Sequence, residues 1–293
     1  MKNLFSIFSA SLYLMLSLFC GCAGENSSVK QESAQNAKEI TFAYVNWAES
    51  VAMTYLAKSV LEAKGYDVKL FQGSATEVFS ALSNGDADVF LDVWLPKTHQ
   101  HLVDQFKNDI NPVGQTVANT KTGFVVPAYM EHVNSIADLD SVAEQFGGMI
   151  VGIDESSGLM EKARQAIATY QLKINLVPTD GKRMVSRLRN AVQQEEPIVV
   201  TLWRPHYIFA DTKLKFLKDP LNVFGEGESI YVYEHRKFSE ADPILNRFLK
   251  NFKLTNTELS RLMEAFEDKK EDPEMSAKKW VEANKILVNS WFN

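Results

Sequence analysis

Residues 40–65 read ITFAYVNWAESVAMTYLAKSVLEAKG and predict a short buried strand followed at once by an amphipathic helix. The apolar run Ile40–Val45 has the length of a strand. From Ser50 to Lys64 apolar side chains recur with a period near 3.6, and Gly65 is a typical helix stop. A strand that leads directly into a helix begins a strand–helix–strand unit, so this stretch favours an α/β fold with parallel strands.

The alternation of short apolar runs with amphipathic stretches continues through the rest of the chain. Further strands are predicted at Val68–Phe71, Ala87–Val93, Gly123–Pro127, Met149–Ile153, Pro197–Leu202 and Ser229–Tyr233. Further helices are predicted at Thr76–Leu82, Gly158–Tyr170 and Met184–Gln194, with three more that start near Ala241, Thr257 and Pro273. No sequence repeat or Pro-rich linker interrupts residues 40–293, so two lobes would be joined by ordered strands.

The first 24 residues have the layout of a secretory signal. Lys2 precedes an apolar run from Leu4 to Phe19, and small residues follow at 21–24. The run is shorter than the roughly 20 apolar residues of a membrane-spanning helix. We expect residues 1–21 to be a signal peptide and Cys22 to be lipidated; two ordinary thiols in a discarded signal are the alternative. Residues 22–39 would then hold the lipidated cysteine and a flexible tether, and the protein would be extracytoplasmic, anchored by lipid to a membrane in the periplasm or at the cell surface.

Composition and motifs argue against several function classes. The 293 residues carry a net charge of −6 and no run of Lys or Arg, which argues against nucleic-acid binding. A P-loop, a Gly-x-Ser-x-Gly motif and a cysteine nucleophile are all missing from the expected mature sequence, so neither an enzyme nor a cofactor is predicted. His99 and His101 have the spacing of a partial metal site, but a helix start after Pro96 explains them better, and no metal is expected.

Three of the five tryptophans follow predicted strands, and these are Trp47, Trp94 and Trp203. Each stands at the carboxyl end of its strand, where open α/β sheets bind ligands. Pro96 and Pro205 end two of these strands, two residues after the tryptophan. Three indole faces suit a quaternary ammonium group, which has no N–H to donate and is attracted by each aromatic face with about 0.5–2 kcal/mol. The sequence therefore predicts a cation-binding cage at this edge of the fold.

Two acidic residues lie close to these tryptophans in the sequence. Glu49 follows Trp47 by two residues and would attract the cation, but it would equally favour the dipole of the helix that begins near Ser50. Asp92 precedes Trp94 by two residues, and a structural role on its strand explains it as well as a role toward the ligand. The residues alone leave both alternatives open.

Five segments, in this order, resemble the receptors of ABC transporters for glycine betaine and choline: YVNWAESVA (44–52), GDADVFLDVWLPKTH (85–99), GFVVPAY (123–129), GID (152–154) and VVTLWRPH (199–206). The resemblance extends from about Ile40 to Phe238. It implies an α/β, two-lobed periplasmic-binding-protein fold of type II, in which each lobe is a mostly parallel sheet flanked by helices. Lobe one would comprise residues 40–122 and 207–293, and lobe two residues 123–206. The implied partners are an ABC permease and its ATPase, and the receptor would be a monomer.

The site that the resemblance implies comprises an aromatic cage of Trp47, Trp94 and Trp203, with Glu49, His206 and Ser157 as further ligand-binding residues. Glu49 matches an acid near the cation in choline-binding members, and His206 would meet a betaine carboxylate. Ser157 lies in the segment 154–158, which departs from a Gly- and Ala-rich family pattern. Thr122 stands where some choline receptors have a cage tyrosine, so glycine betaine is favoured over choline. A choline or carnitine receptor, and a sensory module not coupled to transport, are the alternatives.

Overall fold

The computed structural model describes residues 38–267 and 272–293. The expected signal peptide, Cys22 and nearly all of the expected tether lie outside these residues and stay predictions. Within the described part, no helix is both long enough and apolar enough to cross a membrane.

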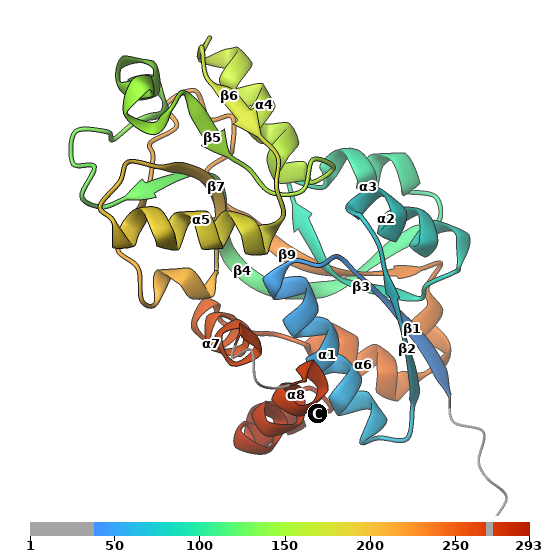
Figure 1. Cartoon of the computed structure of the whole chain (residues 1–293). Helices are drawn as coiled ribbons and strands as arrows, with labels where there is room; N and C mark the ends of the chain where they lie inside the picture. Colours follow the sequence, from blue (N-terminus) through green and yellow to red (C-terminus); the bar gives the residue numbers. More distant parts are fainter. Residues whose placement is uncertain (1–37, 268–271) are drawn as a thin grey trace, which may run out of the picture. The chain divides into compact units, whose positions relative to one another are not determined.

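Strands and helices alternate through most of the described chain (Figure 1). The strands are β1 (Glu39–Tyr44), β2 (Asp67–Gln72), β3 (Val89–Leu95), β4 (Ile110–Pro127), β5 (Met149–Val151), β6 (Asn175–Val177), β7 (Val199–Arg204), β8 (Leu214–Phe216) and β9 (Glu228–His235). The α-helices are α1 (Ala48–Glu62), α2 (Ala75–Asn84), α3 (Gln100–Phe106), α4 (Gly158–Thr169), α5 (Gly181–Gln193), α6 (Pro243–Asn251), α7 (Asn256–Glu267), α8 (Pro273–Ala283) and α9 (Lys285–Ser290). Short 3₁₀ helices are η1 (Ile136–Phe146), η2 (Tyr207–Phe209) and η3 (Phe238–Ala241).

The strands form one path in the order β2-β1-β3-β9-β4-β7-β5-β6, with β8 paired to β4. On one side β2, β1 and β3 are parallel, and on the other β7, β5 and β6 are parallel. The 18-residue strand β4 belongs to both sides, because its first part pairs with β9 and its end pairs with β7. The prediction of an α/β fold with mostly parallel sheets flanked by helices is confirmed. We call the strands β2, β1, β3 and β9 the first half-sheet, and β7, β5, β6 and β8 the second.

The structure differs from the sequence prediction at several places, and β6 and β8 were not among the predicted strands. Strand β4 begins at Ile110, whereas only its last five residues were predicted, because Pro112 and three shifts of register against β9 break the apolar alternation. The last predicted helix is two helices, α8 and α9, separated at Asn284.

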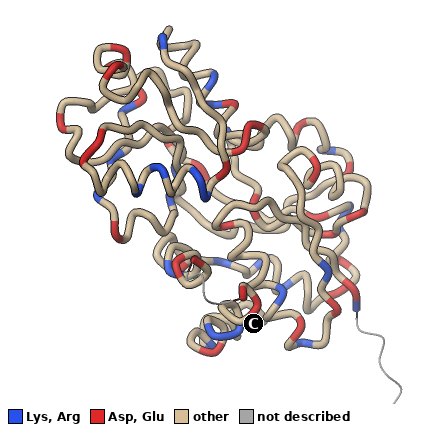
Figure 2. The backbone as a smooth tube through the Cα atoms, in the orientation of Figure 1, with Lys and Arg blue, Asp and Glu red and all other residues tan. Residues whose placement is uncertain are grey.

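Helices cover the first half-sheet on both faces (Figure 1). Helix α1 packs on β1, β2 and β3 and is itself covered by α7 and α8, while α2 packs against β1, β3 and β9. In the second half-sheet α4 packs against β4 and β7. Lys, Arg, Asp and Glu are interspersed along the whole described trace, with no stripe of one sign (Figure 2). The carboxyl ends of β1, β3, β5 and β7 are the segments that build the pocket described next.

Candidate functional site

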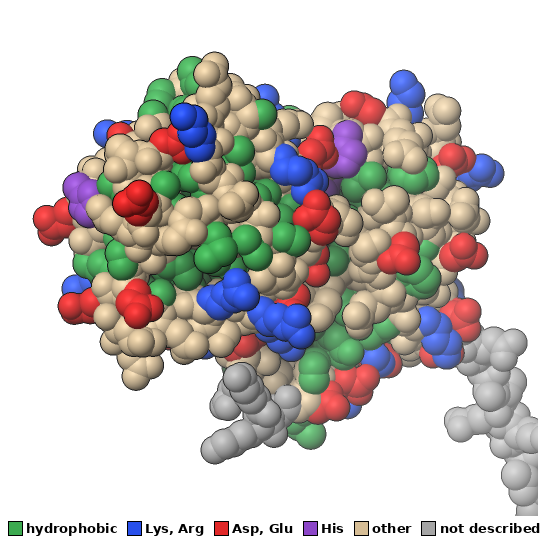
Figure 3. All heavy atoms as spheres, turned by 45° about the horizontal axis from the view of Figure 1, so that its top comes forward, with side chains coloured by type: hydrophobic (Ala, Val, Ile, Leu, Met, Phe, Trp, Pro, Cys, Tyr) green, Lys and Arg blue, Asp and Glu red, His purple; other side chains and the backbone are tan. Residues whose placement is uncertain are grey.

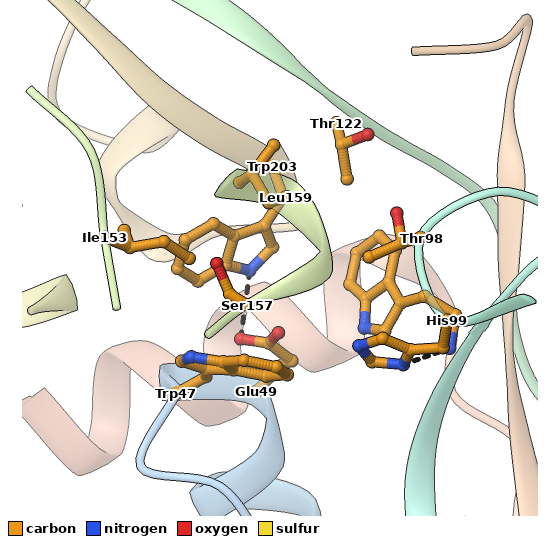
Figure 4. A pocket seen from close by; sticks show the side chains of 10 residues that line it. Trp47, Glu49, Thr98, His99, Thr122, Ile153, Ser157, Leu159 and Trp203 are labelled. Atoms are coloured by element: carbon orange, nitrogen blue, oxygen red, sulfur yellow. Dashed lines mark hydrogen bonds between the residues drawn. The ribbon is translucent and has the colours of Figure 1, made fainter. Parts of the chain in front are cut away.

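A pocket lies where the carboxyl ends of the parallel strands of both half-sheets meet (Figure 4). Its walls come from the segments after β1, β3, β5 and β7 and from one residue of β4. The lining residues are Trp47, Glu49, Trp94, Thr98, His99, Thr122, Ile153, Ser157, Leu159 and Trp203. No Lys or Arg lines this pocket. A pocket lined by three indoles and one carboxyl group, with no basic side chain among its described lining residues, is suited to a cation.

The three indoles of the pocket are held in the same way. Each ring N–H donates to the oxygen of an acidic side chain: Trp47 Nε1 to Asp154 Oδ2 at 3.1 Å, Trp94 Nε1 to Asp92 Oδ1 at 2.8 Å, and Trp203 Nε1 to Glu49 Oε2 at 2.9 Å. Each tryptophan is at most 5% exposed. Because the polar edge of each ring is occupied, the ring keeps one orientation and its apolar surface lines the pocket.

Trp94 and Trp203 are the penultimate residues of β3 and β7, and a proline follows each strand. The Leu95–Pro96 and Arg204–Pro205 peptide bonds are both cis, and each proline directly follows the last residue of its strand. The sequence prediction that these prolines end the two strands is confirmed. Two of the indole–acid hydrogen bonds, from Trp47 and from Trp203, join the first half-sheet side to the second, because Asp154 follows β5 and Glu49 begins α1.

The position of Glu49 is compatible with both roles that the sequence left open. It lies in the first turn of α1, and its side chain is 2% exposed and lines the pocket beside Trp203 (Figure 4). Burial raises the pKa of Glu49 to about 8, against the lowering effect of its hydrogen bonds. Asp92 is fully buried, does not line the pocket, and has a pKa raised by burial and by the charge of Glu49.

His99 is the N-cap of α3, which confirms the predicted helix start, and it also lines the pocket. The turn from Trp94 to His99 is closed twice: His99 N–H donates to the Trp94 carbonyl at 2.9 Å, and Trp94 N–H donates to His99 Nδ1 at 3.1 Å. Burial lowers the pKa of His99 to about 3, so the ring is neutral and its proton sits on Nε2. That nitrogen is buried and has no partner among the described residues. The pocket therefore holds an N–H donor that is ready for an acceptor.

The start of α4 forms another part of the wall. Ser157 is the N-cap of α4, and its hydroxyl accepts from Met160 N–H at 3.2 Å. Both Ser157 and Leu159 line the pocket. The first N–H groups of a helix have no partner inside the helix and favour a negative group. This wall and His99 are thus both suited to an anionic part of a ligand.

The comparison with protein families decides which group the chain falls into. A family model named OpuAC, described as the substrate binding domain of an ABC-type glycine betaine transport system, matches residues 38–283. The chain belongs to this family. Substrate-binding proteins of ABC importers are extracytoplasmic receptors and not enzymes, and the family resemblance stated from the sequence motifs is confirmed.

The chain is also similar to individual glycine betaine-binding proteins. It is 37% identical, over 153 residues, to the glycine betaine/carnitine transport binding protein GbuC of Listeria monocytogenes, and the match covers 51% of each protein. The match thus spans about half the length of that relative. The closed, glycine betaine-bound crystal structure of lactococcal OpuAC is similar with a TM-score of 0.82 and 29% identity, covering 87% of this chain and all of that one. The glycine/betaine/L-proline-binding protein ProX of Borrelia burgdorferi gives 0.83 and 28%, covering 87% and 97%.

Five of the six ligand-binding residues predicted from the OpuAC family motifs lie together in the pocket: Trp47, Trp94, Trp203, Glu49 and Ser157. The structure places the sixth, His206, outside it. The His206 ring meets the edge of Trp203 at 4.8 Å between centroids, stacks on Tyr207 at 4.4 Å, and accepts from Ile208 N–H through Nδ1. His206 therefore backs the tryptophan, whereas His99 faces the pocket.

Proposed function

We propose that this protein is an extracytoplasmic receptor that binds glycine betaine, or a related quaternary-ammonium osmolyte, and delivers it to an ABC importer. The observation that carries the proposal is the set of three acid-anchored indoles around a pocket with a buried carboxyl group and no basic side chain. A choline or carnitine receptor of the same type is the alternative ligand assignment. A sensory module not coupled to transport is the alternative function, and genes for a permease and an ATPase beside its own gene would argue against it.

The trimethylammonium group of the ligand would lie among Trp47, Trp94 and Trp203. Each ring face attracts a cation by about 0.5–2 kcal/mol, and the upper value applies where water is excluded. The ionised form of Glu49 adds a Coulomb attraction that a low-dielectric surrounding strengthens. Membership of the OpuAC family and the ligands of similar proteins support this assignment.

The carboxylate of glycine betaine would meet His99 Nε2–H and the start of α4 at Ser157. His99 supports this because it lines the pocket and its donor nitrogen is buried and has no hydrogen-bond partner among the described residues. An unsatisfied buried donor costs about 1–3 kcal/mol, and a carboxylate would satisfy it. Choline has a hydroxyl group in place of the carboxylate, so this wall favours the betaine. In this account His206 acts by holding the edge of Trp203.

His99→Ala tests the assignment of the two ends of the ligand. We expect the dissociation constant for glycine betaine to rise about tenfold to a hundredfold, the loss of a charge-assisted hydrogen bond of about 1.5–3 kcal/mol. Choline, which has no carboxylate, should lose less than about threefold by isothermal titration calorimetry. His132→Ala, on an exposed side chain remote from the pocket lining, is the matched control. Equal losses for both ligands would show that His99 only supports Trp94.

We also propose that lobe one comprises residues 40–122 and 207–293 and lobe two residues 123–206, and that the lobes close on the ligand. The two indole–acid hydrogen bonds between the half-sheets, from Trp47 to Asp154 and from Trp203 to Glu49, support closure at this pocket. Cys22 would carry the lipid that holds the receptor at the membrane. The receptor would act as a monomer that meets the permease and its ATPase.

A further inference from the structure

Two carboxyl groups are buried behind the same pocket. Glu49 is 2% exposed and Asp92 is fully buried. Each accepts the N–H of one indole, Trp203 for Glu49 and Trp94 for Asp92. The second oxygen of Asp92, Oδ2, is buried and has no hydrogen-bond partner among the described residues. Asp92 thus has one donor at hydrogen-bonding distance among the described residues, the Trp94 indole, while the nearby Ser50 side chain acts to lower its pKa against the raising effect of burial.

The elements around the pair offer no positive charge to balance it. His99 after β3 and His206 after β7 are both buried, and burial lowers the pKa of each to about 3, so both are neutral. Asp154, before α4, brings a further carboxyl group to Trp47. The cation next to His206 is Arg189 on α5, which stacks on Tyr207 at 5.5 Å and does not line the pocket.

The titratable groups of the neighbouring strand β9 include two phenols and two buried carboxyl groups, Glu228 and Glu234. Strand β9 pairs with β3 through Tyr231 and Tyr233, opposite Val93 and Phe90. Burial raises the pKa of Tyr233, so it stays neutral at physiological pH. Two carboxyl groups in a dry site without a counter-cation cannot both be ionised at little cost. In the absence of a cation, one of the two carboxyl groups must therefore keep a proton.

We propose that Asp92 is the second acid of the cation site, and that it shares one proton with Glu49 in the empty receptor, which the incoming quaternary ammonium group expels to solvent. This inference rests on the proposed function, because it takes the ligand to be a cation. Asp92 would act on the ligand through Glu49 and Trp94 and not by direct contact, since it does not line the pocket. The positive charge of the ligand then stabilises both carboxylates.

Release of the shared proton makes the affinity for the ligand depend on pH. Burial raises the pKa of Glu49 to about 8, and burial together with the charge of Glu49 raises the pKa of Asp92. Below about pH 8 the closed pocket without a ligand holds the proton, and the cation must displace it on binding. Affinity should therefore rise with pH up to about 8 and stay level above it, with a slope of at most about tenfold per pH unit for one linked proton.

Calorimetry in two buffers of different ionisation enthalpy counts the proton directly. At pH 7 wild-type protein should release close to one proton for each glycine betaine bound. In Asp92→Asn the amide oxygen still accepts the Trp94 N–H, so the ring stays in place while the charge is lost. We expect proton release to fall to less than about half, and the slope of affinity against pH to flatten below pH 8. In the double variant Glu49→Gln and Asp92→Asn, proton release should vanish.

If Asp92 only orients the Trp94 ring, the Asp92→Asn variant should behave differently. Affinity in Asp92→Asn would then change equally at every pH, with the proton count of wild type, and the proposal would be overturned. Infrared spectroscopy of the ligand-free protein adds a test that needs no ligand. Wild type at pH 7 should show a protonated buried carboxyl band that the double variant lacks, and absence of this band in wild type overturns the proposal. If no quaternary ammonium solute binds, the proposed function fails, and the band still decides whether the pair holds a proton.

Discussion

Gly158→Ala is expected to lower the affinity for glycine betaine by about tenfold to a hundredfold and to leave the melting temperature of the ligand-free protein nearly unchanged. A methyl group at Gly158 would lie 2.2 Å from the Thr98 carbonyl oxygen and 2.7 Å from its Cγ2. Contacts this short cannot exist, so the start of α4 must move away from the turn after β3. Overpacking of this kind costs about 1–3 kcal/mol, and 1.4 kcal/mol is a factor of ten in affinity.

The requirement for glycine at position 158 comes from space and not from backbone conformation, because Gly158 has no positive φ and begins an ordinary helix. Thr98 follows a strand of the first half-sheet, whereas α4 belongs to the second. Moving them apart also stretches the hydrogen bonds from Trp47 to Asp154 and from Trp203 to Glu49. His101 on α3 and Glu161 on α4 approach to 3.4 Å across the same junction. On the face in Figure 3, charged side chains of both signs and a histidine lie close together near its upper middle.

Gly181→Ala is the matched control for this variant. Gly181 is also the first residue of a helix, α5, and a methyl group there would meet nothing within 4 Å. It should bind glycine betaine like wild type, as measured by isothermal titration calorimetry. Small-angle scattering should show that ligand compacts wild type and Gly181→Ala but not Gly158→Ala. Wild-type affinity and compaction in Gly158→Ala would contradict a closed form in which Thr98 and Gly158 touch.

Trp94→Ala is expected to weaken glycine betaine binding by at least about tenfold, or 1.4 kcal/mol. The variant removes one of three aromatic faces, and the buried surroundings of Trp94 place its contribution toward the upper part of the 0.5–2 kcal/mol range. It also leaves Asp92 Oδ1 without its indole donor. The loss should appear in the dissociation rate, because the ring holds the bound cation and does not guide its entry.

Trp94→Phe separates the ring face from the indole N–H. Phenylalanine keeps an aromatic surface but donates nothing to Asp92, so we expect an affinity between those of wild type and Trp94→Ala. Melting temperatures of the ligand-free variants show whether the fold persists. Unchanged binding in Trp94→Ala would remove this tryptophan from the cage.

Much of the fold was predictable because it depends on local patterns. The 3.6-residue period after Ser50 and the apolar run before it define α1 and β1 to within about two residues. Trp94 and Trp203 could be placed at strand ends because a proline stops each strand two residues later. The long strand β4 was mostly missed, since its first part is paired through shifts of register that leave no regular alternation.

The partners of Trp47 and Trp203 could not be predicted, because they are far away in the sequence, whereas Asp92 is two residues from Trp94. Asp154 is 107 residues from Trp47, and Glu49 is 154 residues from Trp203. His99 was correctly predicted at a helix start, but its place in the pocket could not be predicted because it depends on the turn that folds it back onto Trp94. His206 was placed near the ligand because it follows Trp203 closely, but the turn after β7 directs its ring to Tyr207. The sequence thus predicted the three tryptophans of the pocket, whereas the acids that accept hydrogen bonds from Trp47 and Trp203 are seen only in the folded chain.

The central claim is that the pocket of Trp47, Trp94 and Trp203 recognises a positive charge and not merely a shape. Glycine betaine and 3,3-dimethylbutanoate have the same shape and the same carboxylate, but the second has carbon in place of the charged nitrogen. Isothermal titration calorimetry of the purified protein with both compounds tests the claim most directly. We expect glycine betaine to bind at least about a hundredfold more tightly, because three aromatic faces and Glu49 act on its charge. Equal affinity for the two compounds, or binding of neither, would contradict the account.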